Sequence, residues 1–455
     1  MFRYLYVVII LLLAAMLFAE PEFYPMTQVG EAFLNTSNAV CNDAVAGLNI
    51  VEDQFHNGEF FSMRYYSQST GLSNPFSEAR VDYYDITAFP TVIFNGTEEI
   101  IGGGPSIING SEYAQLINQN RFAPSPIMMQ VIDFNSFYGT LAVTVTMKSS
   151  TYSIQNQSIH FVLVQNGLPT EPTNIIREVI TQPITLSGLN SNVSFNVNFD
   201  TEIYGIVPEY WVAAFVQLDN GSILQAVSIL SQPTYQIRAA MPFSPTIIDS
   251  ANINYNSETV WFYNLGQADN YTIRLLPDNN PADWYLNYCN ETGGCFPGDI
   301  PNPFSLASGE VIGFHLNLLV GNSGTSTFHF IVESPNISPY IVPFTYQTEN
   351  TPNDDQFVPE TNVQLLQNYP NPFTNETTFC LYTRQTSQPV EIEIFNPKGQ
   401  KVKVLNTGIL KTGTSTITWN GTDLKGRKLP QGIYYSRIRN DNKSKTIKML
   451  IMNNK

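Results

Sequence analysis

The fold of the C-terminal part of the chain is decided by three consecutive runs, Val390-Glu391-Ile392-Glu393-Ile394-Phe395, Asn396-Pro397-Lys398-Gly399-Gln400 and Lys401-Val402-Lys403-Val404-Leu405. The first and third runs alternate apolar and polar residues, and a period of two is typical of a half-buried β-strand. The middle run contains Asn, Pro and Gly, which favour turns. The sequence therefore predicts a β-hairpin. Similar short runs continue to residue 435 and predict a small β-sandwich of roughly seven strands.

Several motifs follow one another in a fixed order through residues 362–455. They comprise a Pro-rich entry, two turn glycines, a strand tryptophan and a closing aromatic strand: Tyr369, Pro370, Asn371, Pro372, Phe373, Gly399, Trp419, Gly432 and Tyr434. In this order they resemble the type A C-terminal sorting domain of the type IX secretion system of Bacteroidota and related bacteria. The resemblance implies that the segment is an export address. Its implied partners are the type IX translocon and a C-terminal signal peptidase.

The N-terminus carries a pattern that agrees with export. Arg3 supplies a positive charge, residues 4–18 are almost wholly apolar, and the small residue Ala19 precedes Glu20. An apolar run of this length, followed by polar sequence, is typical of a secretory signal peptide rather than of a transmembrane helix. We therefore expect residues 1–19 to be a signal peptide and the mature protein to lie at the cell surface, associated with the outer membrane, or outside the cell.

Charge is divided unevenly along the chain. Residues 363–455 contain 14 Lys and Arg against 5 Asp and Glu, a net charge of +9, whereas the remaining 8 basic and 33 acidic residues give −25. A basic tail favours an anionic partner, and anionic lipopolysaccharide of the outer membrane is the candidate. The acidic body is unsuited to binding nucleic acid, so no nucleic-acid partner is expected.

The segment that follows the signal peptide reads as an α/β domain. Residues 31–36 predict a strand and turn, and apolar residues at three- and four-residue spacing between Val40 and Phe55 predict a helix. A strand is predicted at residues 60–66. Phe89-Pro90-Thr91-Val92-Ile93-Phe94-Asn95-Gly96 then predicts a further strand and an Asn-Gly hairpin before Gly102 and Gly103. This order resembles a thioredoxin fold, which we expect over residues 20–123. The resemblance implies that Pro90 is the cis-proline facing the active-site loop.

The expected active site departs from the redox members of that family. Redox members carry Cys-x-x-Cys at the helix start, where the helix dipole lowers the pKa of the first Cys. Here the matching stretch is Asn38-Ala39-Val40-Cys41, so the attacking position holds Asn38. Without the nucleophile, two-step disulfide exchange cannot proceed. The sequence therefore predicts a degenerate site in which Cys41 is a small buried residue, with no catalytic residue.

Residues 124–242 alternate like the strands of a β-sandwich, for example at residues 141–147, 158–164 and 211–217. A thioredoxin-like domain followed by such a sandwich resembles a Bacteroidota family of exported proteins named after a twenty-eight-kilodalton outer-membrane founder. This resemblance covers roughly residues 28–231. It implies architecture and location, and it carries no general enzymatic activity.

A second, immunoglobulin-like sandwich is expected over residues 243–347. Cys289 and Cys295 lie close together within it, and in an exported protein such a pair favours a disulfide that closes a small loop. The alternative, a metal site, lacks a second pair of Cys or His nearby. This pairing leaves Cys41 and Cys380 without a partner. Residues 348–361 are polar and contain Pro, which predicts a linker to the tail.

These observations together predict a multidomain protein with an α/β thioredoxin-like N-terminal domain followed by all-β, immunoglobulin-like sandwiches. The predicted function is that of an exported, non-enzymatic binding or structural protein without metal or cofactor, whose ligand the sequence does not identify. Two alternatives remain open. One is a thiol-dependent redox protein that uses Cys41, and the other is a surface adhesin or glycan-binding protein, which exposed loop aromatics would favour.

Overall fold

The computed structural model describes residues 20–56, 58–69, 71–166, 173–200, 210–230, 232–291, 294–348, 363–365, 368, 373–383, 389–411, 413–440 and 443–452. The chain divides into two compact units. The first comprises the chain through Pro242 together with Tyr263–Gln267, and the second comprises Phe243–Phe262 and Ala268–Lys455. The predicted signal peptide, almost all of the predicted linker, and Tyr369 to Pro372 of the sorting motif lie outside the described residues.

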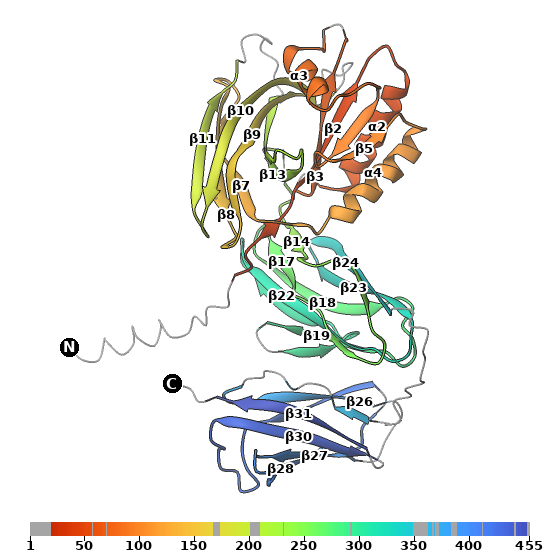
Figure 1. Cartoon of the computed structure of the whole chain (residues 1–455), viewed down its shortest axis with the longest axis vertical. Coiled ribbons are helices and arrows are strands. Elements are labelled where there is room, and N and C mark those ends of the chain that lie inside the picture. Colours follow the sequence, from red (N-terminus) through yellow and green to blue (C-terminus); the bar gives the residue numbers. More distant parts are fainter. Residues whose placement is uncertain are drawn as a thin grey trace, which may run out of the picture. The chain divides into compact units, whose positions relative to one another are not determined.

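In the described part of the first unit, helices are interspersed with strands up to residue 120, and strands alone follow (Figure 1). They are β1 (Tyr24–Pro25), β2 (Gln28–Leu34), α2 (Val40–Gln54), β3 (Phe60–Tyr66), α3 (Pro75–Tyr83), β4 (Thr91–Phe94), β5 (Glu98–Ile101), α4 (Ser106–Asn120), β6 (Pro124–Ser125), β7 (Ile127–Asn135), β8 (Thr140–Met147), β9 (Ser153–Gln165), β10 (Ile175–Ser187), β11 (Asn192–Asn198), β12 (Tyr210–Gln217), β13 (Ile223–Ser228) and β14 (Ile237–Ala240).

One eight-stranded sheet, in the order β13-β12-β9-β10-β3-β2-β4-β5, runs through the first unit. β2 pairs with β3 in parallel and with β4 antiparallel, and β5 continues antiparallel from β4. β10 joins the two halves by pairing in parallel with β3 at Ile175 and Arg64. The predicted segments 20–123 and 124–242 therefore share one sheet rather than being separated by a linker.

The helices α2 and α4 cover one face of the β2–β5 part of this sheet (Figure 1). Ala44, Leu48, Val51 and Phe55 of the predicted apolar stripe are buried there, as expected for an amphipathic helix. Val40, the first residue of α2, differs from the prediction because it is 37% exposed. A side chain at the first helical position projects beyond the end of the packed face, so the stripe begins one turn later.

The β9–β13 half of the sheet forms a sandwich with the three-stranded sheet β11-β8-β7. Its core consists of inward-facing aliphatic and aromatic residues, among them Val143, Val145, Phe161 and Leu163. The alternation that predicted these strands recurs in their burial: in β8, every second side chain is buried. The β-sandwich predicted for this segment is thus present.

The opposite face of the eight-stranded sheet encloses a core that both halves share. Phe33 of β2, Val162 of β9 and Trp211 of β12 belong to it, together with Val81 from α3. The sheet curls back on itself, because Ile223 at the start of β13 donates a backbone hydrogen bond to Asn95 O (2.8 Å) beyond β4. This curvature creates an interior that no single segment of the sequence could form.

The strands between Phe243 and the predicted linker form two sheets. They are β15 (Thr246–Asp249), β16 (Asn254–Asn256), β17 (Val260–Asn264), β18 (Asp269–Pro277), β19 (Tyr285–Asn290), β20 (Cys295–Pro297), β21 (Asn302–Leu306), β22 (Val311–Leu319), β23 (Thr325–Ser334) and β24 (Ile337–Thr348). One sheet has the order β17-β22-β19-β20, with β16 on β22, and the other β15-β24-β23-β18-β21. Ring contacts such as Phe262–Phe330 and Phe304–Phe314 join the sheets into an aromatic core.

The tail contains β25 (Val363–Leu365), β26 (Thr377–Thr383), β27 (Glu391–Phe395), β28 (Lys401–Asn406), β29 (Gly413–Trp419), β30 (Gly432–Asn440) and β31 (Lys443–Ile451). These strands form one sheet in the order β25-β26-β29 and a second in the order β28-β27-β30-β31. Among the described residues, the core between these sheets contains only residues from Val363 onward. The predicted hairpin of β27 and β28 is present, and the described part of the chain is mostly β-sheet in several sheets, consistent with the predicted β-sandwiches.

Candidate functional site

Asn38 lies in the loop between β2 and α2, at the position where the sequence predicts a missing nucleophile. Its Nδ2 atom donates a hydrogen bond to the carbonyl oxygen of Phe89 at 2.6 Å. Its Oδ1 atom accepts from the backbone N–H of Val40 at 3.1 Å, which satisfies one of the free donors at the start of α2. The amide side chain therefore bridges the helix start and the chain segment at residue 89.

The segment that Asn38 contacts contains a cis peptide bond between Phe89 and Pro90. Pro90 is buried, and its carbonyl accepts a hydrogen bond from Gly102 N at 2.7 Å. Phe89 is half-buried beside it. The structure thus brings Asn38, the start of α2 and the cis-proline together.

Cys41 lies in the first turn of α2 and points into the core between the helix and the sheet. It is 3% exposed, and its Sγ accepts a hydrogen bond from Asn35 N at 3.3 Å. Burial raises the pKa of the Cys41 thiol above its usual value, against the smaller opposing effect of the Asn35 N–H. The thiol is protonated near neutral pH, and a protonated, buried thiol is a poor nucleophile.

A buried polar network, which the sequence analysis missed, crosses the enclosed interior of the first unit. Arg80 of α3 donates from Nε and Nη2 to both carboxylate oxygens of Glu31 on β2, at 2.7 and 2.8 Å. Tyr84 donates to the same carboxylate at 2.7 Å, and Arg80 Nη1 reaches Oε1 of Gln217 on β12 at 2.9 Å. This network joins three elements that are far apart in the sequence.

The electrostatics of this network favour the ionised pair. Burial opposes ionisation of Glu31, but the Arg80 guanidinium and its hydrogen bonds hold the pKa of Glu31 below its ordinary value. His160 of β9 lies nearby, and burial together with the positive charge of Arg80 lowers its pKa to about 4. His160 is therefore neutral near pH 7. A charged residue inside an apolar strand, as Glu31 is, was the signal that could have revealed the network.

Cys289 and Cys295 form a disulfide with an S–S distance of 2.03 Å. They lie directly opposite each other on β19 and β20, so the bond closes the hairpin between these strands. Among the described residues, no three Cys, His, Asp or Glu side chains are arranged to hold a metal ion. The side chain of Cys380 lies outside the described part of the chain.

The described residues of the predicted sorting motif meet mainly in the core of the tail. Phe373 is 2% exposed and packs against Trp419 with a ring-centroid distance of 5.5 Å, and Trp419 packs in turn against Tyr434 at 6.4 Å. Gly399 and Gly432 adopt positive φ angles of 76° and 150°, which glycine tolerates best. These five residues therefore stabilise the tail module and shape its turns.

No helix in the described part of the chain is both long and apolar enough to cross a membrane. Residues 371–444 match the family described as the FlgD Ig-like domain, which agrees with the sandwich found there. No curated protein matches the chain.

The solved structures similar to this chain include three proteins of Porphyromonas gingivalis. HBP35 is 12% identical, with a TM-score of 0.37, over 71% of this chain and 98% of that one. Dimeric latent PorU is 13% identical, with a TM-score of 0.21, over 78% of this chain and 40% of that one. PorZ, described as an essential bacterial surface component of the type-IX secretion system, is 15% identical, with a TM-score of 0.15, over 28% of this chain and 15% of that one.

Proposed function

We propose that this chain is an exported, non-enzymatic binding or structural protein. Residues 20–123 would be a thioredoxin-like domain with a degenerate active site, and residues 362–455 would direct the chain through the type IX secretion system to the cell surface or the medium. The translocon, the C-terminal signal peptidase and an anionic lipopolysaccharide are the partners proposed for the basic tail. The ordered motifs of that segment support the export route.

One observation supports the non-enzymatic part of the proposal: Asn38, which the thioredoxin resemblance assigns to the attacking position, has an amide where redox members have a thiol. It is tied to Phe89 O at 2.6 Å, next to the cis-proline. The remaining thiol, Cys41, is 3% exposed and has a raised pKa. In the redox members of the resembled family this junction holds the substrate peptide, so an extended peptide would bind beside Pro90 here, without the group required to form a mixed disulfide. Peptide binding without exchange is the activity that this arrangement favours.

Insulin reduction tests this proposal. The wild-type chain should show no reductase activity above the uncatalysed rate in the presence of dithiothreitol, and Cys41→Ser should not change that result. The Asn38→Cys variant would place a second thiol one helical turn from Cys41, at the positive end of α2, where the dipole favours a thiolate. We expect this variant to reduce insulin at least about tenfold faster than wild type, because it gains the attacking thiolate that the wild-type chain lacks.

The double variant Asn38→Cys/Cys41→Ser is the matched control, because it has the new thiol without its resolving partner. Reductase activity of the wild-type chain that disappears in Cys41→Ser would instead support the thiol-dependent alternative. A folded Asn38→Cys variant that forms no intramolecular disulfide would contradict the thioredoxin-like assignment.

Glycan binding is a second candidate function, favoured by the hairpin tip between β7 and β8. Phe137 and Tyr138 are 79% and 68% exposed there and contact each other edge to face at 4.9 Å. Asn135 Oδ1 accepts from the backbone N–H groups of both residues, which holds the tip in one conformation. Rigid exposed aromatic rings are suited to stacking on sugar rings.

A glycan array probed with wild-type protein and a Phe137→Ala/Tyr138→Ala variant tests this candidate. If the tip binds sugars, the variant should lose about tenfold or more in affinity, because two stacking contacts are removed. Leu189→Ala, at another exposed apolar turn residue, is the control and should bind like wild type. An array on which wild type binds no glycan would contradict this candidate.

A further inference from the structure

We propose that the free edge of β5, with the hollow between β5 and α4, binds an extended basic segment of a partner protein as an added β-strand. This inference goes beyond the proposed function, because it concerns a surface distinct from the region of Asn38 and Pro90. Three observations carry it: the open edge of the sheet, the shape of the hollow beside it, and the charge of its rim.

β5 is the last strand of the eight-stranded sheet and pairs only with β4 among the described strands. Gly102 N donates a backbone hydrogen bond to Pro90 O, and Val92 lies opposite Ile100 two residues further along. Because hydrogen-bonded pairs recur at every second residue of an antiparallel pair of strands, the N–H and C=O groups of Ile100 point toward β4. The N–H and C=O groups of Glu99 and Ile101 consequently point away from β4. An exposed edge of this kind is a template for a further strand.

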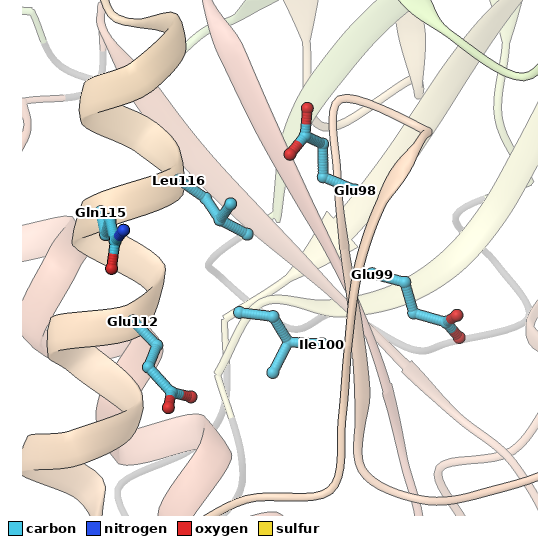
Figure 2. A pocket seen from close by; sticks show the side chains of 6 residues that line it. All are labelled: Glu98, Glu99, Ile100, Glu112, Gln115 and Leu116. Carbon is cyan, nitrogen blue, oxygen red and sulfur yellow. The ribbon is translucent and has the colours of Figure 1, made fainter.

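The hollow lies between this edge and α4 and encloses about 280 Å³. Figure 2 shows Ile100 of β5 and Leu116 of α4 directed toward each other across it, forming an apolar floor. A volume below the ~300–1,000 Å³ of small-molecule pockets suits one or two side chains rather than a separate ligand. A strand on β5 would place every second side chain on the α4 face, where the hollow receives it.

Glu98, Glu99 and Glu112 line the hollow, and Figure 2 shows the carboxylate of Glu99 pointing to the face of β5 away from α4. In the described part of the chain no Lys, Arg or His forms an ion pair with any of them, in contrast to the paired Glu31, Glu52 and Glu59 of the same unit. The part of the chain before the tail carries a net charge of −25, which adds to the local negative potential. A partner strand that carries Lys or Arg matches this charge.

The two faces of the added strand would meet different surroundings. On the α4 face, an aliphatic residue would cover Ile100 and Leu116, and a neighbouring basic residue would reach Glu98 or Glu112. On the other face the strand would meet Glu99 and Ile101, whose side chain is 62% exposed. The partner segment is therefore an extended stretch in which Lys or Arg is interspersed with aliphatic residues. Main-chain bonds would supply affinity and the side chains specificity.

The test is binding of the synthetic peptide Lys-Val-Lys-Val-Lys-Val to the full chain, measured by calorimetry and by amide hydrogen exchange. We expect binding that weakens with added salt, and slower exchange at Glu99 and Ile101 when the peptide is bound. The peptide Glu-Val-Glu-Val-Glu-Val should not bind. In the variant Glu98→Lys/Glu112→Lys the affinity should fall about tenfold or more, because two attractive charges become repulsive.

Asp53→Lys is the matched control, since it reverses an exposed charge on α2 away from the hollow and should bind like wild type. Glu98→Gln/Glu112→Gln removes charge without repulsion and should show an intermediate loss. Equal binding of both peptides, unchanged affinity in the charge-reversed variant, or unaltered exchange at Glu99 and Ile101 would each overturn the proposal. So would a concentration-dependent dimer that protects these amides without peptide, since a second copy would then occupy the edge.

Discussion

Replacing Arg80 by methionine is expected to lower the free energy of unfolding of the first unit by about 3–5 kcal/mol, because it leaves a buried carboxylate without its partner. Glu31 is 0% exposed and receives two hydrogen bonds from Arg80, at 2.7 and 2.8 Å. Because methionine fills a similar volume, the loss of stability in this variant reports mainly the unpaired charge of Glu31 and only to a small extent a cavity. Gln217 would also lose its contact with the guanidinium.

Amide hydrogen exchange of β2, β9 and β12 is the appropriate measurement, because a chain with several cores need not unfold in one step. The double variant Glu31→Leu/Arg80→Met should be less destabilised than Arg80→Met alone, since both members of the pair are then apolar. Arg274→Met is the control: its salt bridge with Glu333 joins side chains that are 35% and 37% exposed, and its loss should cost under about 1 kcal/mol. An effect of Arg80→Met as small as this control would contradict the prediction.

The pH dependence follows from the direction of the Glu31 pKa. In the wild-type protein that pKa is lowered in the folded state, so the stabilisation is present above the unfolded value and is lost as pH falls through the folded value. In Arg80→Met the buried carboxyl has no cation, and its pKa in the folded state should rise above the unfolded one. The destabilisation caused by Arg80→Met should therefore shrink as the pH is lowered.

The sequence predicted the individual elements well because their signals are local. The alternation in residues 141–147 and 390–405 reflects one buried and one exposed face, which is a property of a single strand or hairpin. The apolar spacing in residues 44–55 likewise reports one face of one helix. Each of these patterns depends only on residues a few positions apart, so the sequence alone is enough to recognise it.

The arrangement of these elements depended on contacts that no local pattern contains. The pairing of β10 with β3 is a single parallel register point between Ile175 and Arg64, more than one hundred positions apart. That junction makes one sheet of two predicted segments and creates the enclosed interior. Glu31 was visible as a charge in an apolar strand, but its partners on α3 and β12 could not be named without the curvature of the sheet.

The candidate site was partly predictable for the same reason. An asparagine three residues before Cys41 is a local observation, and so is a proline before an apolar strand. The contact between Asn38 Nδ2 and Phe89 O, however, joins residues that are 51 positions apart. The hollow beside β5 had no sequence signal, because Glu98 and Glu112 become neighbours only when α4 packs along the edge strand. The sequence does not show which charged residues on separate elements lie close together.

Deleting residues 363–455 is expected to abolish delivery to the cell surface while leaving the rest of the chain folded and retained in the periplasm. The tail encloses its own core, and among the described residues the cores of the first unit contain none from the tail. The deletion therefore removes the proposed address without removing buried side chains from those cores. Cell fractionation and surface proteolysis, in a bacterium that has a type IX secretion system, would measure the distribution.

Two point variants of the full-length chain test whether delivery requires the folded tail module or only a chain of full length. Trp419→Ala removes a 1% exposed ring that packs against Phe373 and Tyr434. It should lower the free energy of unfolding of the tail by about 3–5 kcal/mol, and most of the variant protein should fail to reach the cell surface. Glu391→Lys changes an exposed residue of the same module and should be delivered normally. Mass spectrometry should find the tail removed from surface-delivered wild type. Surface delivery of the truncated chain would refute the sorting role, whereas an intact tail on delivered protein would refute only its removal.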